Sequence, residues 1–419
     1  MHRFAQAPSS PIRYLAVLLS LALVAPFGVA KSATLEVWIV NWNENTHALF
    51  ESKLIPAFQQ RWPGVDVNVT WTSWSNHRER LTVAIAAGVG PDVFQVGGSD
   101  TGWIAANQLA QPLTRYFDAW EHRDAVPSGI VASMTRDGEV WSVPYIAAPR
   151  TLVYLRDTFE VVGMDPDAPP STWAEIMDVV RKFMLKEGDK LARIGLQLTL
   201  SGTNVFETWS PFLQQAGGRV ATESLEPAFV SEEGVASLEF YRDLVLMQEL
   251  HVFGTGGLSF WNNEIGMLIS NSSTITNGLN QGLITFEDVV IAPPPLNKKR
   301  VATVFTDPLT ISSTTQNPDL AWAFIEFLLE PENLAAYNET FGFVPPLISA
   351  LDTEYVQTNP IVQAYGYVIQ YAHEIPALAE YFDIRSAISV DLTEAVNGRL
   401  PVRTALEQAA AKWRALRTE

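Results

Sequence analysis

The stretch LEVWIVNWNENTHALFESKLIPAFQQRWPGVDVNVTW, residues 35–71, decides the fold class of this chain. Residues 35–40 are almost continuously apolar, which predicts a strand buried on both faces. Large apolar residues then recur at every fourth position from Phe50 to Trp62, which predicts an amphipathic helix ended by the following Pro-Gly pair. Valines alternate with polar residues over 65–71, which predicts a second strand. This order of elements is typical of an open α/β sheet with parallel strands.

The same alternation continues beyond this stretch. We expect a helix over 76–87 and a third buried strand over 92–96. Open α/β sheets bind their ligands beyond the carboxyl ends of the strands. The loops at 41–45 and 97–100, which follow two of these strands, are therefore the first candidates for a ligand site.

A second α/β unit is predicted after a proline-punctuated boundary near residues 143–151. Thr172 and Glu175 form a capping box, which predicts a helix that begins there and runs to about Lys186. Strands and helices then alternate again, with strands expected at 194–200, 265–269, 289–292 and 301–312, and helices at 205–215, 231–250, 319–329 and over most of 361–419.

Composition excludes several classes of function. The chain of 419 residues is long enough for two or three domains. Its net charge of −18 argues against a nucleic-acid partner and against docking on anionic lipid, since both require a basic surface. The chain has no cysteine, which rules out disulfides, thiol nucleophiles, Cys-zinc sites and a lipid-modified N-terminal cysteine.

The N-terminus has the pattern of a secretory signal peptide. Arg3 and Arg13 precede an apolar run over 14–25, and Gly28-Val29-Ala30 is a small-x-small cleavage site. The run is short for a membrane span, which needs roughly 20 residues. We therefore expect residues 1–30 to be removed on export to the periplasm, with an uncleaved anchor as the alternative.

Short motifs recur along the chain in a fixed order. They are LEVW at 35–38, WPGV at 62–65, AIAAG at 84–88, GPDV at 90–93, DGEVWSVPY at 137–145, PPSTW at 169–173, GM at 266–267, AFI at 323–325, PEN at 331–333, FGFVPP at 341–346 and NG at 397–398. Together they resemble the extracellular solute-binding proteins of ABC importers, in the maltose-binding-protein-like group that carries sugars and polyols. The resemblance covers nearly the whole chain after the signal peptide, although no single motif is specific.

The resemblance implies a two-lobed α/β clamshell of the periplasmic-binding-protein type, in which each lobe is a sheet flanked by helices. Three chain crossings would form the hinge, near 147–150, 301–304 and 342–346. Lobe 1 would then comprise 34–146 plus 305–341, and lobe 2 would comprise 151–300 plus 347–419. The implied protein is a monomer that needs no cofactor or metal, catalyses no reaction and delivers its ligand to the transmembrane permease subunits of an importer.

A sugar ring needs flat apolar platforms for its faces and planar hydrogen-bonding groups for its rim. Four of the 13 tryptophans are placed by the pattern in loops at the cleft: Trp42, Trp74, Trp209 and Trp261. Trp42 and Trp261 are the strongest of them because polar residues flank both. A tryptophan in a mostly apolar chain is nevertheless often a core residue, and this alternative stays open for each of the four.

Polar candidates come from the loops that the resemblance places at the ligand, after Val40, Val96 and Ile269 and at the Thr306-Asp307 turn. They are Asn43, Glu44, Ser99, Asp100, Asn271, Ser272 and Asp307. Arg150 is a candidate donor from the hinge. The remaining candidates are Tyr145, Phe343, at a position where the group places an aromatic, and Arg385, for which a surface role is the alternative. Many members have a glycine pair where Thr306-Asp307 stands here, and this difference leaves the identity of the ligand undetermined.

Other classes of function remain possible from the residues alone. A secreted glycosidase needs two carboxylates about 5 to 9 Å apart, and 46 acidic residues cannot exclude such a pair. The sequence contains no H-E-x-x-H metalloprotease motif and no G-x-S-x-G elbow. A binder of glycerol phosphate-type solutes and a sensor module with the same clamshell are the further alternatives.

Overall fold

The computed structural model describes residues 33–41, 43–255, 257–373 and 375–417. The predicted signal peptide, residues 1–30, lies outside them. In the described chain, nine strands form one mixed sheet in the order β2-β1-β3-β11-β6-β9-β8-β7, with β10 paired to β6. These strands are β1 (Ala33–Val40), β2 (Val65–Thr72), β3 (Val93–Gln95), β6 (Val143–Leu155), β7 (Leu185–Glu187), β8 (Lys190–Leu196), β9 (Ile265–Ser270), β10 (Val289–Ile291) and β11 (Thr303–Ile311), while β4 (Thr135–Arg136) and β5 (Glu139–Val140) form a separate hairpin.

The parallel unit predicted from the first hundred residues is confirmed. Strand β1 pairs in parallel with both β2 and β3, and Leu35, Val37 and Ile39 on β1 are fully buried. The predicted amphipathic helix is present as α1 (Glu44–Leu49) and α2 (Ile55–Arg61), joined by one π-helical turn over Phe50–Leu54. Helix α3 (His77–Ala86) follows β2 as expected.

The second unit is also present, with one correction. Helix α8 begins at the predicted capping box, where Thr172 Oγ1 accepts from Glu175 N at 3.3 Å and Glu175 Oε2 accepts from Thr172 N at 3.1 Å. The helix ends at Phe183, however, and Leu185–Glu187 forms strand β7 instead of a last helical turn. Gly188 has a φ of 62° and turns the chain from β7 into β8, a conformation that glycine adopts without strain.

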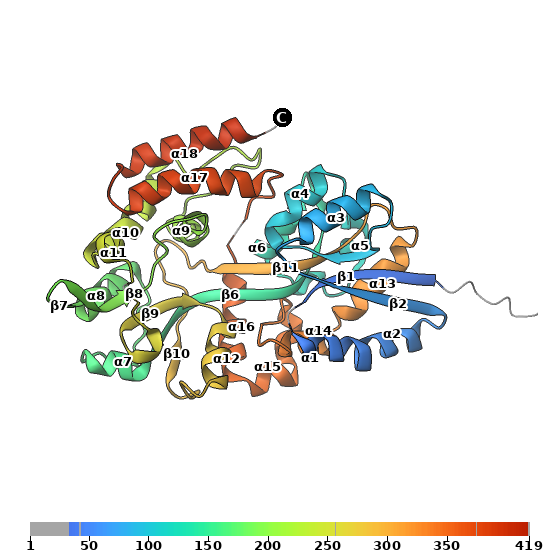
Figure 1. Cartoon of the computed structure of the whole chain (residues 1–419), viewed down its shortest axis with the longest axis horizontal. Coiled ribbons are helices and arrows are strands. Elements are labelled where there is room, and N and C mark those ends of the chain that lie inside the picture. The colour runs from blue at the N-terminus through green and yellow to red at the C-terminus, as the bar shows by residue number, and fades with distance from the viewer. Residues whose placement is uncertain (1–32, 42, 256, 374, 418–419) are drawn as a thin grey trace, which may run out of the picture.

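A long strand replaces the boundary predicted at 143–151. Strand β6 pairs with β11 over residues 143–150 and with β9 and β10 from Thr151 onward. Pro144 and Pro149 lie inside the strand, and the ladder with β11 shifts register between Thr306 and Pro308. The two halves of the sheet therefore share one continuous backbone, and in Figure 1 β6 and β11 run between them.

The three predicted crossings lie next to one another. Arg150 is opposite Thr303 in the sheet, and Ala147 forms an isolated bridge with Val344. Residues 372–373 and 375–378 provide a further link, since Ala372 bridges to Ala302 and Leu378 lies against Gly102. This adjacency supports the proposed division into two lobes and brings part of 347–419 against the first half.

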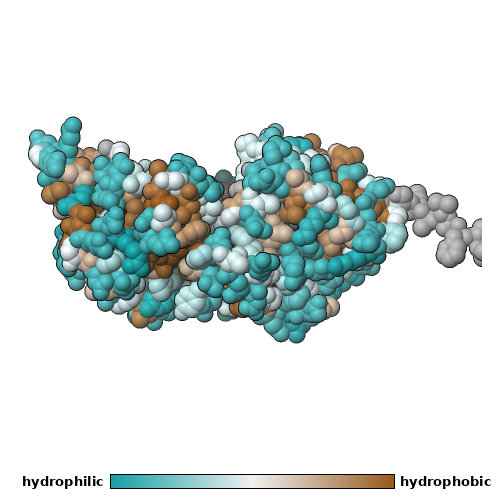
Figure 2. Space-filling view, turned by 90° about the horizontal axis from the view of Figure 1, so that it is seen from below, coloured by the Kyte–Doolittle hydropathy of each residue, from teal (hydrophilic) through white to brown (hydrophobic). Residues whose placement is uncertain are grey.

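Helices cover the sheet in both halves of the molecule (Figure 1). The other helices are α4 (Thr101–Ala106), α5 (Thr114–Ala119), α6 (Ser128–Met134), α7 (Arg156–Val161), α9 (Asn204–Gln215), α10 (Glu232–Met247), α11 (Leu250–Phe253), α12 (Ser272–Asn280), α13 (Pro318–Leu328), α14 (Pro331–Glu339), α15 (Glu354–Thr358), α16 (Pro360–Val368), α17 (Tyr381–Val396) and α18 (Val402–Leu416). In the described chain, no helix combines the length and the apolarity needed to cross a bilayer. Figure 2 shows two masses joined by a narrower middle, with apolar residues scattered among polar ones on the face in view.

Candidate functional site

A cavity of about 390 Å³ lies where β6 changes its pairing partners. Hydroxyl and amide side chains alternate around it with apolar and aromatic ones, which is the mixed lining that small-molecule sites show. Its lining residues include Arg150, Thr151, Gln197, Thr199, Asn204, Glu207, Thr208, Phe212, Gln215, Tyr241, Ser270, Thr274, Thr303 and Phe305.

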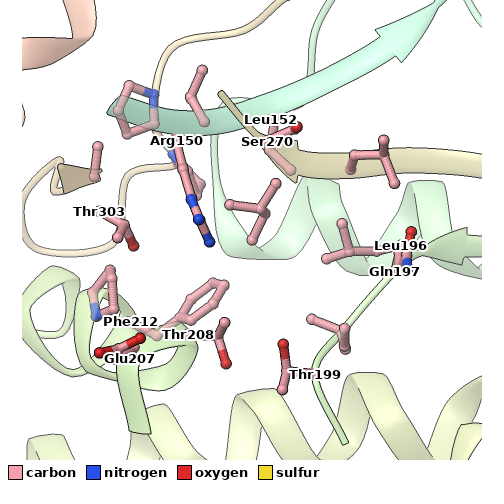
Figure 3. Close-up of a pocket in the computed structure, with 18 of the residues that line it drawn as sticks. Arg150, Leu152, Leu196, Gln197, Thr199, Glu207, Thr208, Phe212, Ser270 and Thr303 are labelled. Atoms are coloured by element: carbon pink, nitrogen blue, oxygen red, sulfur yellow. The ribbon is translucent and has the colours of Figure 1, made fainter. Parts of the chain in front are cut away.

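Polar groups reach the cavity from the carboxyl ends of two parallel strands and from helix α9. Strand β8 leads into Gln197 and Thr199, and β9 ends at Ser270, so that both strands deliver polar groups at the same edge of the sheet. Helix α9 supplies Glu207 and Thr208 from below the sheet (Figure 3). This is the edge at which open α/β sheets bind ligands.

A buried tyrosine holds part of the wall in place. Tyr241 on α10 donates its hydroxyl hydrogen to Thr199 O at 2.9 Å and accepts from Thr199 N at 3.0 Å. Thr208 Oγ1 lies 3.2 Å from the same hydroxyl. Burial raises the pKa of Tyr241 to about 12, so the group stays protonated and keeps donating. The loop after β8 is thereby tied to α9 and α10.

The acid in the cavity wall is already paired. Glu207 forms an ion pair and hydrogen bond with Arg385 on α17, and their side chains are 12% and 17% exposed. The Arg385 guanidinium also lies 4.9 Å from the ring centre of Phe382. A pair this shielded from water holds α9 against α17 and leaves Glu207 with most of its charge neutralised.

Arg150 extends from β6 into the cavity (Figure 3). Its guanidinium lies over the ring of Phe305, 4.7 Å from the centroid. Burial lowers the pKa of Arg150, and the negative charge of Glu207 opposes that effect. Arginine is charged at all physiological pH values, so Arg150 presents a cation to the cavity.

The first half contributes two carboxyl groups near the crossings. Asp100 is buried, accepts from Gly97 N at 2.9 Å, and has Arg78 Nε 3.3 Å from its Oδ1. Burial raises the pKa of Asp100, and Arg78 opposes the shift. Burial, together with repulsion from Asp100, raises the pKa of Asp307 to about 7. The guanidinium of Arg78 lies 4.3 Å from the ring centre of Phe382, so this group touches the second half of the molecule.

Metal coordination finds no support in the described residues, which contain no cluster of three or more His, Asp or Glu side chains able to hold an ion. The buried histidine near the cavity, His373, has its pKa lowered to about 4 by burial and by the charge of Arg150. It is therefore neutral at physiological pH, and its Nδ1 accepts from Val304 N at 3.1 Å.

Of the predicted site residues that the structure describes, Arg150 lines this cavity and the others do not. Two of them lie in the hydrophobic core. Tyr145 is 0% exposed and stacks on Tyr337, with ring centres 4.0 Å apart. Trp209 is also 0% exposed and donates from Nε1 to Ser237 Oγ at 3.0 Å. The placement of Trp209 in a cleft loop was wrong, because it lies inside α9 on the face that packs against α10.

Several predicted polar residues have hydrogen-bond partners within the protein. Asn43 and Asn271 cap α1 and α12, where their side chains accept from Thr46 N and Thr274 N. Asn43 Nδ2 also donates to Thr340 O at 2.8 Å. Ser272 is fully buried and donates to Gly342 O at 2.7 Å, which ties α12 to the third crossing.

The remaining predicted residues vary in their exposure. Phe343 is buried against Phe341, and Trp261 packs edge-on against Phe260. Ser99 and Asp307 are half-buried, while Glu44 and Trp74 are exposed. Trp42 lies outside the described residues.

The sequence patterns did not indicate most of the residues that line the cavity. Gln197, Thr199, Glu207, Thr208 and Phe212 come from the loop after β8 and from α9. The rule that ligands bind beyond strand ends indicated the loops after the strands at 35–40 and 92–96, and the resemblance added the loop after residue 269. Neither indicated the loop after the strand expected at 194–200. In the structure that strand ends at Leu196, so Gln197 and Thr199 lie in the loop after it and not inside the strand as predicted. Nothing in the sequence identifies the face of α9 that meets the cavity.

Comparisons with known proteins agree with this architecture. A putative binding protein of Brucella abortus is 21% identical over 407 residues, covering 94% of this chain and 96% of the relative. The sn-glycerol-3-phosphate-binding periplasmic protein of Shigella dysenteriae is 24% identical over 367 residues, covering 82% of this chain and 81% of the relative.

Among solved structures, the cyclic α-maltosyl-1,6-maltose binding protein of Arthrobacter globiformis superposes with a TM-score of 0.80. It is 20% identical and covers 91% of this chain and 98% of its own. The fold is therefore the two-lobed α/β fold of periplasmic binding proteins, as the sequence predicted. The profile described as bacterial extracellular solute-binding protein matches residues 43–335, well over half of the chain, and this protein belongs to that family.

Proposed function

We propose that this protein is the substrate-binding component of an ABC sugar importer and that it captures a mono- or oligosaccharide, or a polyol, in the cavity beside β6. The cavity is the observation that carries the proposal: polar groups such as Gln197, Thr199 and Thr208 surround a space that also holds the rings of Phe212 and Phe305. Hydroxyl and amide groups match the rim of a sugar, and rings match its faces. Relatives that bind saccharides support this class of ligand.

The proposed mechanism is closure of the two lobes around the ligand, without chemical change of it. A ligand that contacts both lobes only in the closed form binds that form more tightly and shifts the population toward it. To raise the ratio of closed to open forms from 1:99 to 99:1, the ligand must bind the closed form more favourably than the open form by roughly 5.5 kcal/mol. Several buried hydrogen bonds at about 1 kcal/mol each, with ring stacking of similar size, supply this amount.

The setting of the proposed function follows from the family and from the N-terminal sequence. The protein acts in the periplasm as a monomer after removal of residues 1–30, and its closed form is recognised by the permease subunits of the importer. Membership in a family of bacterial extracellular binding proteins and the periplasmic relative support this location.

Thermal-shift screening of the purified protein against sugars and polyols tests the proposal. A true ligand at 100 times its dissociation constant adds about 2.7 kcal/mol to the free energy of unfolding. Analysis of the recovered ligand by mass spectrometry then separates binding from turnover. Hydrolysis of an oligosaccharide would contradict the binding function, and so would the failure of every sugar and polyol to stabilise the protein.

A further inference from the structure

The cavity contains a positive charge that forms no ion pair with a described residue, although the charge of Glu207 acts on it from a distance. Arg150 lines the cavity and lies over Phe305, but its guanidinium makes no hydrogen bond and no ion pair with any described side chain. The acid nearest in the lining, Glu207, is engaged by Arg385. Two arginines therefore lie near this one carboxylate, and of the two Arg150 lines the cavity.

The other titratable groups near the cavity supply no counter-charge to Arg150. His373 is neutral because its pKa is about 4. Asp100 has its own cation in Arg78, 3.3 Å away. Asp307 is partly protonated at neutral pH, since its pKa is about 7, and it does not line the cavity. A cation held partly out of water without a counter-charge is costly, and a ligand that brings the opposite charge removes that cost.

The arginine in the cavity contrasts with the acidic character of the whole chain. The protein carries a net charge of −18, yet its cavity presents an arginine without an acidic partner. A guanidinium offers two parallel N–H donors that match the oxygens of a carboxylate or a phosphate. Arg150 also lies beside the hinge, where Arg150 pairs with Thr303 and the next residue pairs with β9, so lobe closure would bury the contact it makes.

We infer that the ligand of this cavity is an acidic sugar or polyol, carrying one carboxylate or phosphate group that Arg150 recognises. The inference deepens the proposed function and rests on it. Gln197, Thr199 and Thr208 bind the hydroxyl groups, and Arg150 selects against the neutral compound of the same shape.

Calorimetric titration with matched pairs of ligands tests the inference. The pairs are glucose with glucuronate and with glucose 6-phosphate, galactose with galacturonate, and glycerol with sn-glycerol 3-phosphate. We expect at least one acidic member to bind about 10- to 100-fold more tightly than its neutral partner, because a hydrogen bond to a charged group contributes more than a neutral one. Comparison of the uronates with the phosphates shows whether the preferred anionic group is a carboxylate or a phosphate.

Variants of the intact mature protein assign the preference to Arg150. Arg150→Met is expected to abolish the preference for the acidic member, and Arg150→Lys to retain part of it through charge alone. Arg181→Met is the matched control, since it removes the same charge from an exposed position on α8. It should leave both affinities unchanged, and thermal unfolding confirms that each variant is folded.

Two results would overturn the inference in distinguishable ways. If neutral members bind as tightly as acidic ones and Arg150→Met weakens both equally, Arg150 binds hydroxyl groups and the sugar-binding function stands. If no member of any pair binds and no other sugar or polyol stabilises the protein, the proposed function fails and the inference fails with it.

Discussion

Glu207 and Arg385 show how one pair of residues joins two helices that are far apart in sequence. Their ion pair links α9 to α17, and both side chains are shielded from water. Removing one partner of such a pair leaves the other charge buried and uncompensated. The sequence suggested Arg385 as a candidate ligand contact, with a surface role as the alternative, and the structure gives it an acidic partner 178 residues away.

We predict that Glu207→Gln lowers the free energy of unfolding by about 2 to 3 kcal/mol, because the charge of Arg385 then lacks a counter-charge while it is shielded from water. The double variant Glu207→Gln with Arg385→Met should recover part of this loss. Urea denaturation measures both. The control is Asp178→Asn in the exposed pair with Arg181, which should cost less than about 1 kcal/mol. Equal losses at the two pairs would show that the Glu207–Arg385 pair is as weak as a surface pair.

Trp261, which its polar neighbours suggested as a ligand platform, packs against helix α12 in the structure. Its indole covers Gly278 of α12 so closely that a Cβ at that glycine would meet the ring at 2.5 Å. We predict that Trp261→Ala costs about 2 to 3 kcal/mol of stability and leaves ligand affinity within a few-fold of the parent. Urea denaturation and calorimetric titration check the two parts. Unchanged stability with lost affinity would restore the platform interpretation.

The carboxyl group of Asp307 makes stability depend on pH. Its pKa is 3.8 ordinarily and about 7 in the folded protein, so the folded state favours the protonated form. This contribution to stability is complete below about pH 4 and is lost as the pH rises through 7.

Asp307→Asn keeps the group neutral at every pH. We predict that the free energy of unfolding of this variant, relative to that of the parent, is roughly 2 kcal/mol higher at about pH 8 than at about pH 5. Urea denaturation at the two values measures the difference. Asp352→Asn removes the same charge from an exposed position and should show no such gain. Parallel curves for the parent and the Asp307 variant would contradict the raised pKa.

At the scale of single elements, the best prediction from sequence is the start of α8. The capping box of Thr172 and Glu175 is a local pattern, because both hydrogen bonds join residues three positions apart. The end of the same helix was predicted less well, since the hairpin from β7 to β8 depends on pairing with a later segment.

We predict that Thr172→Ala destabilises the protein by about 1 kcal/mol, because the amide of Glu175 loses its acceptor. Thermal unfolding monitored by circular dichroism measures the loss. Thr82→Ala on the exposed face of α3 is the control, and it should be neutral or slightly stabilising because alanine favours helix. A loss at Thr82 as large as at Thr172 would argue against a specific capping effect.

At the scale of the whole molecule, strands β6 and β11 connect the two halves of the sheet. Since the cavity lies where β6 exchanges one partner strand for others, a small rotation about these strands would change the distance between its walls. The contact of Arg78 with Phe382 is a place where the two halves already touch.

We predict that a ligand found by thermal shift decreases the radius of gyration measured by small-angle X-ray scattering. The physical reason is that contacts with both lobes exist only in the closed form. A sugar that does not stabilise the protein serves as the control and should leave the scattering curve unchanged. A bound ligand with an unchanged radius of gyration would mean that binding needs no closure.

The type and order of the elements, the parallel pairing around β1 and the family could all be predicted from the amino-acid sequence. These follow from local periodicity, caps and turn residues, which act over a few positions along the chain. The sequence also suggested Arg150 through its place at a crossing. The residues that line the cavity, the burial of Tyr145 and Trp209 in the core, and the ion pair of Glu207 became known from the three-dimensional structure. The reason is that burial and charge pairing are set by segments distant in sequence, so a tryptophan or an acid has the same local pattern in a core, in an ion pair or at a ligand.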